Sequence, residues 1–184
     1  KKAKETFVQA FASAKTIEDA DIRAEALTGI AKAQAKAGDV KEAKKTFVQA
    51  FASAKTIEDA DDRAEALTGI ATAQAKAGDV KKAKKTFVQA FATAKTIEDD
   101  DDRAEALADI ATAQAKAGDV KEALASAKTI EDADDRATAL ADIATAQAKA
   151  GDVKEALATT KTIENVYWRA SALTDIAEIL FQIK

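Results

Sequence analysis

A 40-residue segment occurs twice in succession almost unchanged, and this repetition constrains the fold more than any other feature of the chain. Residues 1–40 and 41–80 differ only at positions 2/42, 5/45, 22/62 and 32/72. Each segment ends in Ala-Gly-Asp-Val, and this tetrapeptide returns twice more, so its glycines are Gly38, Gly78, Gly118 and Gly151. Periods of about 20 to 50 residues are typical of solenoids, so the sequence predicts a helical repeat array.

Each Ala-Gly-Asp-Val segment is expected to join two antiparallel helices. Glycine suits the left-handed residue that ends a helix, and the Asp beside it can cap the next helix through its carboxylate. In three copies a Glu follows that Asp by three positions, the spacing of a capping box. These pairs are Asp39/Glu42, Asp119/Glu122 and Asp152/Glu155.

Apolar residues recur three or four positions apart on both sides of each turn, as on one face of a helix. Leu67 and Ile70 precede the Gly78 turn, and Val80, Ala83 and Phe87 follow it. We call the helix before each turn the inner helix and the one after it the outer helix. Inner helices are expected at residues 22–36, 62–76, 102–116, 135–149 and 166–183, and outer helices at 1–17, 40–57, 80–97, 120–130 and 153–163.

The turn glycines are spaced by 40, 40 and 33 residues, so the later outer helices lack seven residues. Seven residues rotate an ideal helix by about 700°, close to two full turns. The later outer helices should therefore lose two turns and bury the same face. We expect one array over residues 1–184, with an orphan outer helix at 1–21, repeats at 22–61, 62–101, 102–134 and 135–165, and a terminal inner helix at 166–184.

The same deletion removes the phenylalanines of the outer helices, and it coincides with a change from Gly to Asp in the inner helices. Gly69 and Phe87 each lie nine residues from Gly78, so an antiparallel hairpin is expected to pack Phe87 over Gly69. Phe47 is expected to pack over Gly29 in the same way. Asp109 and Asp142 replace the glycine where the phenylalanine is missing.

The pattern Leu67, Ile70, Ala71, Gln74, Gly78, Ala83, Phe87 and Ala90 resembles a tetratricopeptide repeat, and the similarity covers the whole chain. It departs from that family in having Gln74 where an aromatic is usual, no closing Pro and longer early units. The resemblance implies an all-α, right-handed superhelix whose inner helices line a concave groove that binds peptides or proteins. The expected groove residues are Glu25, Thr28, Lys32, Lys36, Glu65, Thr68, Thr72, Lys76, Glu105, Thr112 and Lys116.

Composition excludes several functions. The chain has no Cys and no His, which removes thiolate chemistry, disulfides and the usual proton shuttle, so we expect no enzyme, no cofactor and no metal centre. A net charge of −4 and a pI near 5.1 argue against nucleic acid or a membrane surface as partner. We expect a soluble, cytoplasmic protein, and Lys1 inside a repeat indicates a fragment or a processed chain.

Charged residues gather at the two edges of the expected array. The acidic connectors, such as residues 58–62 and 98–102, are interpreted mainly as helix caps rather than calcium sites, because they lack the Gly and distal Glu of a calcium loop. The arginines that follow them are expected to pair with these acids, and they are Arg23, Arg63, Arg103 and Arg136. Lysines gather beside the Ala-Gly-Asp-Val turns.

The function expected from the sequence is a non-enzymatic scaffold for protein or peptide binding. Two alternatives stay open: a self-assembling or designed repeat array without a natural ligand, and an RNA binder of the pentatricopeptide kind. A further hypothesis concerns the ends, because apolar residues cover about 260° of the last helix. That helix either fills the space of the missing phenylalanines or meets another chain head to tail. The candidate end contacts are Phe7, Phe11, Trp168, Leu180 and Phe181.

Overall fold

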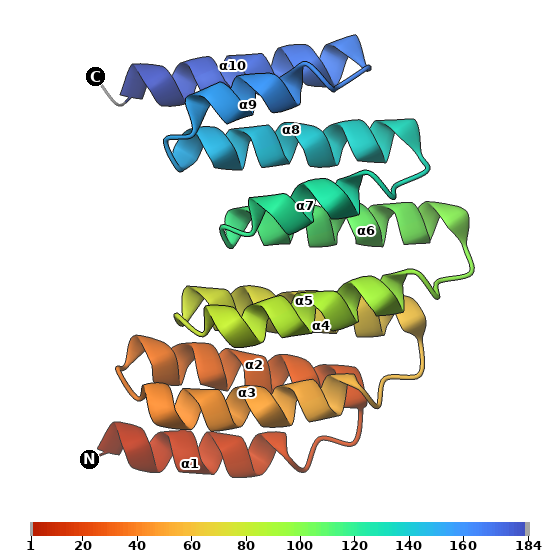
Figure 1. Ribbon diagram of the computed structural model, residues 1–184. Coiled ribbons are helices and arrows are strands. Elements are labelled where there is room, and N and C mark those ends of the chain that lie inside the picture. The colour runs from red at the N-terminus through yellow and green to blue at the C-terminus, as the bar shows by residue number, and fades with distance from the viewer. Residues whose placement is uncertain (1, 183–184) are drawn as a thin grey trace. The chain divides into compact units, whose positions relative to one another are not determined.

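A computed structural model describes residues 2–182, and in that range the chain forms ten α-helices and no β-strand (Figure 1). The all-α fold built from helical repeats is therefore confirmed. Ile183, which the sequence assigned to the last helix, lies outside the described residues. The helices are α1 (Lys2–Ala14), α2 (Ala20–Lys36), α3 (Val40–Ala54), α4 (Ala60–Lys76), α5 (Val80–Ala94), α6 (Asp100–Lys116), α7 (Val120–Ala127), α8 (Ala133–Lys149), α9 (Val153–Thr160) and α10 (Val166–Gln182).

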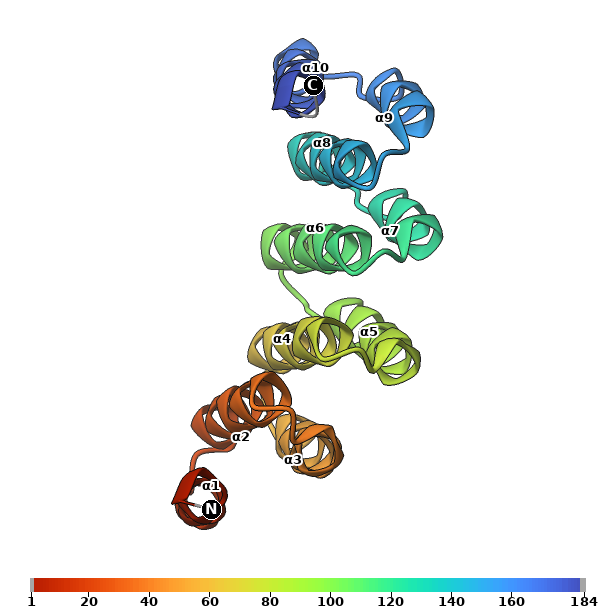
Figure 2. The same cartoon turned by 90° about the vertical axis from the view of Figure 1, so that its left-hand side faces the viewer.

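The chain divides into two compact units, residues 1–96 and 97–184, with α1 to α5 in the first and α6 to α10 in the second. Each unit has a layer of inner helices and a layer of outer helices (Figure 2). In the first unit α2 and α4 lie on one side, and α3 and α5 on the other. In the second unit α6, α8 and α10 form the inner layer, and α7 and α9 the outer one.

Each inner helix from α2 to α8 ends in the glycine turn that the sequence predicts. Gly38 has a φ of +81°, and Gly78, Gly118 and Gly151 lie in the same left-handed region. The amide of Gly78 donates to the carbonyl of Ala75 at 2.9 Å, and the amide of Asp79 donates to the carbonyl of Gln74 at 2.9 Å. These two bonds form a Schellman motif, which satisfies carbonyls at the helix end and reverses the chain.

The prediction that the Asp of each turn caps the outer helix through its side chain is wrong. Asp39, Asp79, Asp119 and Asp152 occupy the cap position, but their side chains make no capping bond. Their amides belong to the Schellman turn, and the carboxylates of the first two point to lysines of the preceding outer helix. Lys4 Nζ lies 3.4 Å from Asp39, and Lys44 Nζ lies 3.9 Å from Asp79. The expected capping boxes do not form either, and Glu42 pairs with Lys45 at 2.8 Å.

Inner helices do receive side-chain caps, from an earlier residue of the acidic connector than the sequence indicated. Asp59 Oδ1 accepts from the amides of Asp61 and Asp62, so α4 begins two residues before the expected start. Asp19, Asp99 and Asp132 act alike. Outer helices end three residues early, because Thr56 and Ile57 donate to carbonyls only three positions back, at Ser53 and Ala54.

The arginines that follow the connectors, in the first turn of the inner helices, bind main-chain carbonyls, not mainly the acids with which they were expected to pair. Arg63 Nη1 donates to the carbonyls of Ile57 at 2.6 Å and Glu58 at 2.9 Å. Arg23, Arg103 and Arg136 make equivalent bonds. Arg103 also pairs with Asp100. The end of an outer helix leaves carbonyls without helical partners, and the several N–H donors of a guanidinium can satisfy them. The carboxylates of the connector are exposed to water and attract the guanidinium less strongly.

Alanines, a few large apolar side chains and a single buried polar contact hold each inner helix to its outer helix. Ala83 and Ala90 of α5 are buried, and Phe87 is 1% exposed. Thr86 donates to Gln74 Oε1 at 2.9 Å across the pair, and both side chains are buried. The same bond recurs three times, from Thr46 to Gln34, from Ser126 to Gln114 and from Thr159 to Gln147, each at 2.8 Å. Thus Gln74, at the position of the expected aromatic, links the two layers.

The effect of the seven-residue deletion is confirmed. Helices α7 and α9 have 8 residues where α3 and α5 have 15. Ala123, Ala127 and Ile130 are buried like their counterparts in the longer helices, so the buried face is kept. Val80, which the sequence placed on that face, is largely exposed at the start of α5.

The predicted packing of phenylalanine over glycine is wrong. Gly29 and Gly69 are exposed, and a Cβ added to either would meet nothing within 4 Å. Phe47 and Phe87 are buried elsewhere in the layer between the helices. Equal distance from the turn gives equal height along the hairpin, but it does not fix the angular position around each helix. These glycines point away from the outer helices.

Gly69→Ala is expected to stabilise the protein by about 0.4 to 1 kcal/mol, because alanine is the better helix former and its methyl group enters open space. Urea unfolding monitored by circular dichroism measures this. Gly78→Ala is the matched control and should destabilise, since Gly78 has a φ of +81°. A loss of stability in Gly69→Ala would contradict the open position.

Candidate functional site: the exposed face of the inner helices

The inner helices present a stripe of accessible side chains spaced four, three and four residues apart, the face turned away from the outer helices. We call it the inner-face stripe. In the first unit each helix carries a Glu at one end of the stripe, a Gly in its middle and a Lys at the other end. The members are Glu25, Gly29, Lys32 and Lys36 on α2, and Glu65, Gly69, Thr72 and Lys76 on α4.

In the second unit the central glycine is replaced by aspartate on every inner helix. The equivalent positions are Glu105, Asp109, Thr112 and Lys116 on α6, Thr138, Asp142, Thr145 and Lys149 on α8, and Ser171, Asp175, Glu178 and Gln182 on α10. The stripe of the first unit has three lysines against two glutamates, whereas that of the second has five acids against two lysines. The two units therefore offer surfaces of different charge.

Polar contacts connect neighbouring helices along the stripe of the second unit. Thr112 Oγ1 donates to Asp142 Oδ2 at 3.2 Å, and Lys116 Nζ lies 3.5 Å from the same oxygen. Thr145 makes the equivalent contact with Asp175 at 3.5 Å. Burial raises the pKa of Asp109, the nearby Lys116 opposes that shift, and the charge of Asp142 adds to it. These contacts link α6 to α8 and α8 to α10 across a stripe that stays polar.

Most of the groove residues that the sequence predicted do lie on this face. Their carboxylates and ammonium groups are exposed at Glu25, Lys32, Lys36, Glu65, Lys76, Glu105 and Lys116, and Thr72 and Thr112 are half-buried. The prediction that Thr28 lines the groove is wrong, because Thr28 is buried and donates to the carbonyl of Ala24 at 2.7 Å. Thr68 is half-buried and turns back to the carbonyl of Ala64 in the same way.

Sequence reasoning missed the central residues of the stripe, Gly29, Gly69, Asp109, Asp142 and Asp175. The change from Gly in the first two inner helices to Asp in the later ones is present in the sequence, but it does not reflect packing against phenylalanine. Both residue types are acceptable to a solvent-facing position, and that shared property was the available signal. Within each unit, these residues lie at the middle of the accessible face of their inner helices.

The acidic connectors crowd together at the starts of the inner helices. Partial burial raises the pKa of Asp135, and the charges of Asp132, Glu105, Asp101 and Asp134 raise it further. In residues 2–182 no three acidic side chains are grouped so that they could hold a metal ion. The close approach of these acids is thus repulsive at neutral pH.

Asp135→Asn is expected to raise the melting temperature at pH 7 by about 1 °C or more. A raised pKa means that the folded state favours the neutral carboxyl, so the stability that Asp135 contributes is full at low pH and is lost as the pH rises through its folded pKa. Burial and the charges of the neighbouring acids both disfavour the charged form of Asp135, and they oppose the usual benefit of an acid in the first helical turn. Thermal melts at pH 7 and pH 3 test this, and a gain of equal size at both values would contradict it.

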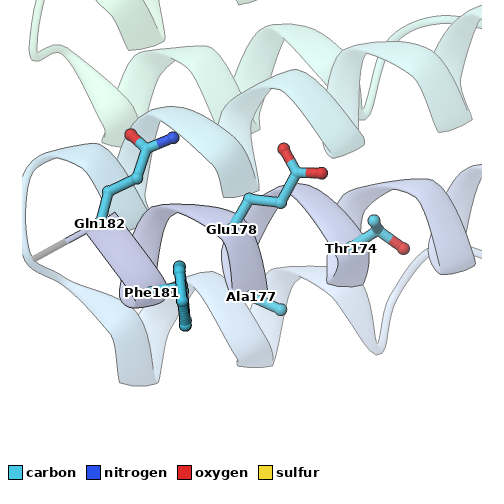
Figure 3. A pocket seen from close by; sticks show the side chains of 5 residues that line it. All are labelled: Thr174, Ala177, Glu178, Phe181 and Gln182. Atoms are coloured by element: carbon cyan, nitrogen blue, oxygen red, sulfur yellow. The ribbon is translucent and has the colours of Figure 1, made fainter. Parts of the chain in front are cut away.

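The final helix, α10, packs on α8 and α9 through Ala172, Ile176 and Ile179. Leu173, Leu180 and Phe181 remain exposed, Phe181 by 82%. Filling the space of the missing phenylalanines therefore does not cover this apolar surface. A hollow of about 350 Å³ lies along α10, lined by Thr174, Ala177, Glu178, Phe181 and Gln182 of the same helix. Figure 3 shows these five side chains.

The other candidate end contacts are partly covered. Phe7 and Phe11 of α1 are half-buried, and Lys15 Nζ lies 5.8 Å from the centre of the Phe11 ring. Trp168 is half-buried and meets Tyr167 edge to face, with the ring centres 5.1 Å apart. The most exposed apolar residues of this set are therefore at the last two turns of α10.

No protein-family model and no curated protein matches this chain. Among solved structures, it is similar to the crystal structure of Ton1535 from Thermococcus onnurineus NA1, with 15% sequence identity and a TM-score of 0.49. That similarity covers 95% of this chain and 84% of the other. Within residues 2–182, no helix combines the length and apolar character needed to cross a membrane.

Proposed function

We propose that this chain is a non-enzymatic scaffold that binds an extended segment of another protein on its inner-face stripe. The carrying observation is the pair Gly29 and Gly69. Each lies in the interior of a helix, where glycine costs about 1 kcal/mol relative to alanine, and a Cβ at either site would meet nothing. Packing gives no reason for these glycines, whereas close approach of a ligand does.

Two neighbouring helices contribute this feature, since α2 and α4 pack together within the first unit. Helices in contact lie about 8 to 10 Å apart, so an extended peptide crossing them can contact both glycines with residues about three positions apart. Glu25 and Glu65 flank the crossing on one side, and Lys36 and Lys76 on the other. The site therefore favours a partner segment whose main chain contacts the two glycines and whose side chains include both acidic and basic groups.

The proposal includes the tetratricopeptide-like assignment. Leu67, Ile70, Ala71, Ala83 and Ala90 are buried at the positions where that pattern places its packing residues. The turn glycine has the left-handed backbone that the pattern requires. These observations support a repeat of that kind, used for binding on its inner helices.

Selection of peptides from a random display library on the full chain, followed by fluorescence anisotropy, tests the function. Gly69→Leu is expected to weaken binding of a selected peptide at least about tenfold, because the side chain occupies the path of the peptide. Its unfolding midpoint should stay at or above that of the parent, since leucine is a good helix former in open space. The matched control is Val88→Leu on the exposed side of α5, which should bind like the parent.

Failure of the library to yield any binding peptide would contradict the proposal. So would a peptide whose affinity is the same for Gly69→Leu and for the parent, because binding would then lie elsewhere on the chain.

A further inference from the structure

Helix α5 differs in charge from the other outer helices. Its 15 residues contain four lysines and no acidic residue. Helix α3 has three lysines and a glutamate, and α7 and α9 have one lysine and one glutamate each. Lys82 stands where those three helices have Glu42, Glu122 and Glu155. The lysines of α5 are Lys81, Lys82, Lys84 and Lys85.

These lysines lie at the end of the helix where a positive charge is least favourable. All four fall within the first six residues of α5, and the N-terminal end of a helix carries a partial positive charge that favours acids over cations. Asp79, which precedes the helix, makes no capping bond and lies 3.9 Å from Lys44 of α3. Lys82 in place of the usual Glu thus breaks a local helix preference, which is typical of a functional surface.

A row of exposed side chains runs along α5, with successive spacings of four, three, four and three residues. It consists of Lys81, Lys85, Val88, Ala92 and Lys95, and Val88 is 59% exposed. At 100° per residue these positions fall within an arc of about 80°, and at 1.5 Å per residue they extend over about 21 Å. We call this set the outer-face row of α5.

Helix α3 has the same exposed residue types at the same spacings, and the short outer helices do not. On α3, Glu42 pairs with Lys45 at 2.8 Å, which reduces the positive charge there. Helices α7 and α9 have 8 residues and end before the position of Val88. Only the first unit carries such rows, in the layer opposite its inner helices (Figure 2). The residues on α3 are Lys41, Lys45, Val48, Ala52 and Lys55.

We propose that the outer-face row of α5 binds an acidic helical segment of another protein, laid alongside α5. Alternating spacings of three and four residues are those of the contact line between two packed helices. The partner helix carries Asp or Glu opposite the lysines at both ends of the row, and apolar residues opposite Val88 and Ala92. This inference is independent of the function proposed for the inner-face stripe, which lies on the inner layer.

The row suits a discrete acidic segment better than a lipid surface. Between its lysines it presents only Val88 and Ala92, whereas helices at a membrane interface bury large apolar side chains. Phe91 is half-buried, and Lys95 Nζ lies 5.9 Å from the centre of its ring. The exposed Glu98 begins an acidic connector directly beyond the row, and an anionic membrane would repel that connector.

Binding of three synthetic peptides to the full chain, measured by fluorescence anisotropy at low salt, tests the proposal. The acidic probe is a helical peptide of about 18 residues, with Glu toward both ends and Leu and Ala at the matching spacings in the middle. The second peptide has Lys in place of each Glu, and the third has Ser in place of each Leu. The acidic probe is expected to bind most tightly, and added salt should weaken it by screening the charges.

Lys81→Glu with Lys85→Glu should weaken binding of the acidic probe at least about tenfold, because repulsion replaces attraction at one end of the row. The urea unfolding midpoint should stay at or above that of the parent, since acids suit the start of a helix. Lys121→Glu with Lys154→Glu is the matched control. It changes the net charge by the same amount, at exposed positions of α7 and α9, and should bind the acidic probe like the parent.

Four outcomes would overturn the inference. The first is a parent chain that does not bind the acidic probe, or binds only vesicles of anionic lipid, which would indicate a membrane surface. The second is equal affinity for the acidic probe and either of the other two peptides. The third is an unchanged affinity in Lys81→Glu with Lys85→Glu. The fourth is an equal loss in the control, because net charge and not the row would then determine binding.

Discussion

The left-handed glycine at the end of an inner helix fixes where the chain reverses, and the packing of each helix pair depends on that reversal. Its Schellman bonds satisfy the last carbonyls of the inner helix and place the next helix antiparallel to it. The Gln and the Thr or Ser that donates to it then come opposite each other at a constant separation of 12 residues. A buried amide and hydroxyl that must satisfy each other leave little freedom in the register of the hairpin.

The second reversal, from outer to inner helix, depends on the connector. Its Asp caps the following inner helix, and an Arg in the first turn of that helix binds the carbonyls left by the preceding outer helix. Because the connector keeps these bonds, the outer helix can lose seven residues without loss of the fold, as α7 and α9 show. In the second unit Thr112 meets Asp142, 30 positions ahead, although the repeat is 33 residues long. Neighbouring inner helices are thus offset along their axes.

Two accessible surfaces of the protein, the inner face and the end surface at α10, differ in polarity. The buried contacts of each helix pair, among them alanines, large apolar side chains such as Phe87 and Ile70 and one polar pair, lie on the side away from the inner face. No neighbour restricts the inner face at its centre, so glycine is accepted there, and aspartate stands at the equivalent positions of the second unit. At α10 the pattern changes to Leu180 and Phe181, which the fold of the described residues does not cover. A polar inner face and an apolar end surface are suited to different contacts.

The sequence by itself determined the class of fold, the number of helices, the turn glycines, the buried alanine and phenylalanine positions and the consequence of the seven-residue deletion. These features depend on local backbone preference and on helical periodicity, which neighbouring residues specify. Only the tertiary structure decided that Asp39 turns to Lys4 and not to its own helix, that Arg63 binds carbonyls and that Gly69 faces solvent. Each of these depends on the angle at which one helix meets the next, and periodicity along a single helix does not encode that angle.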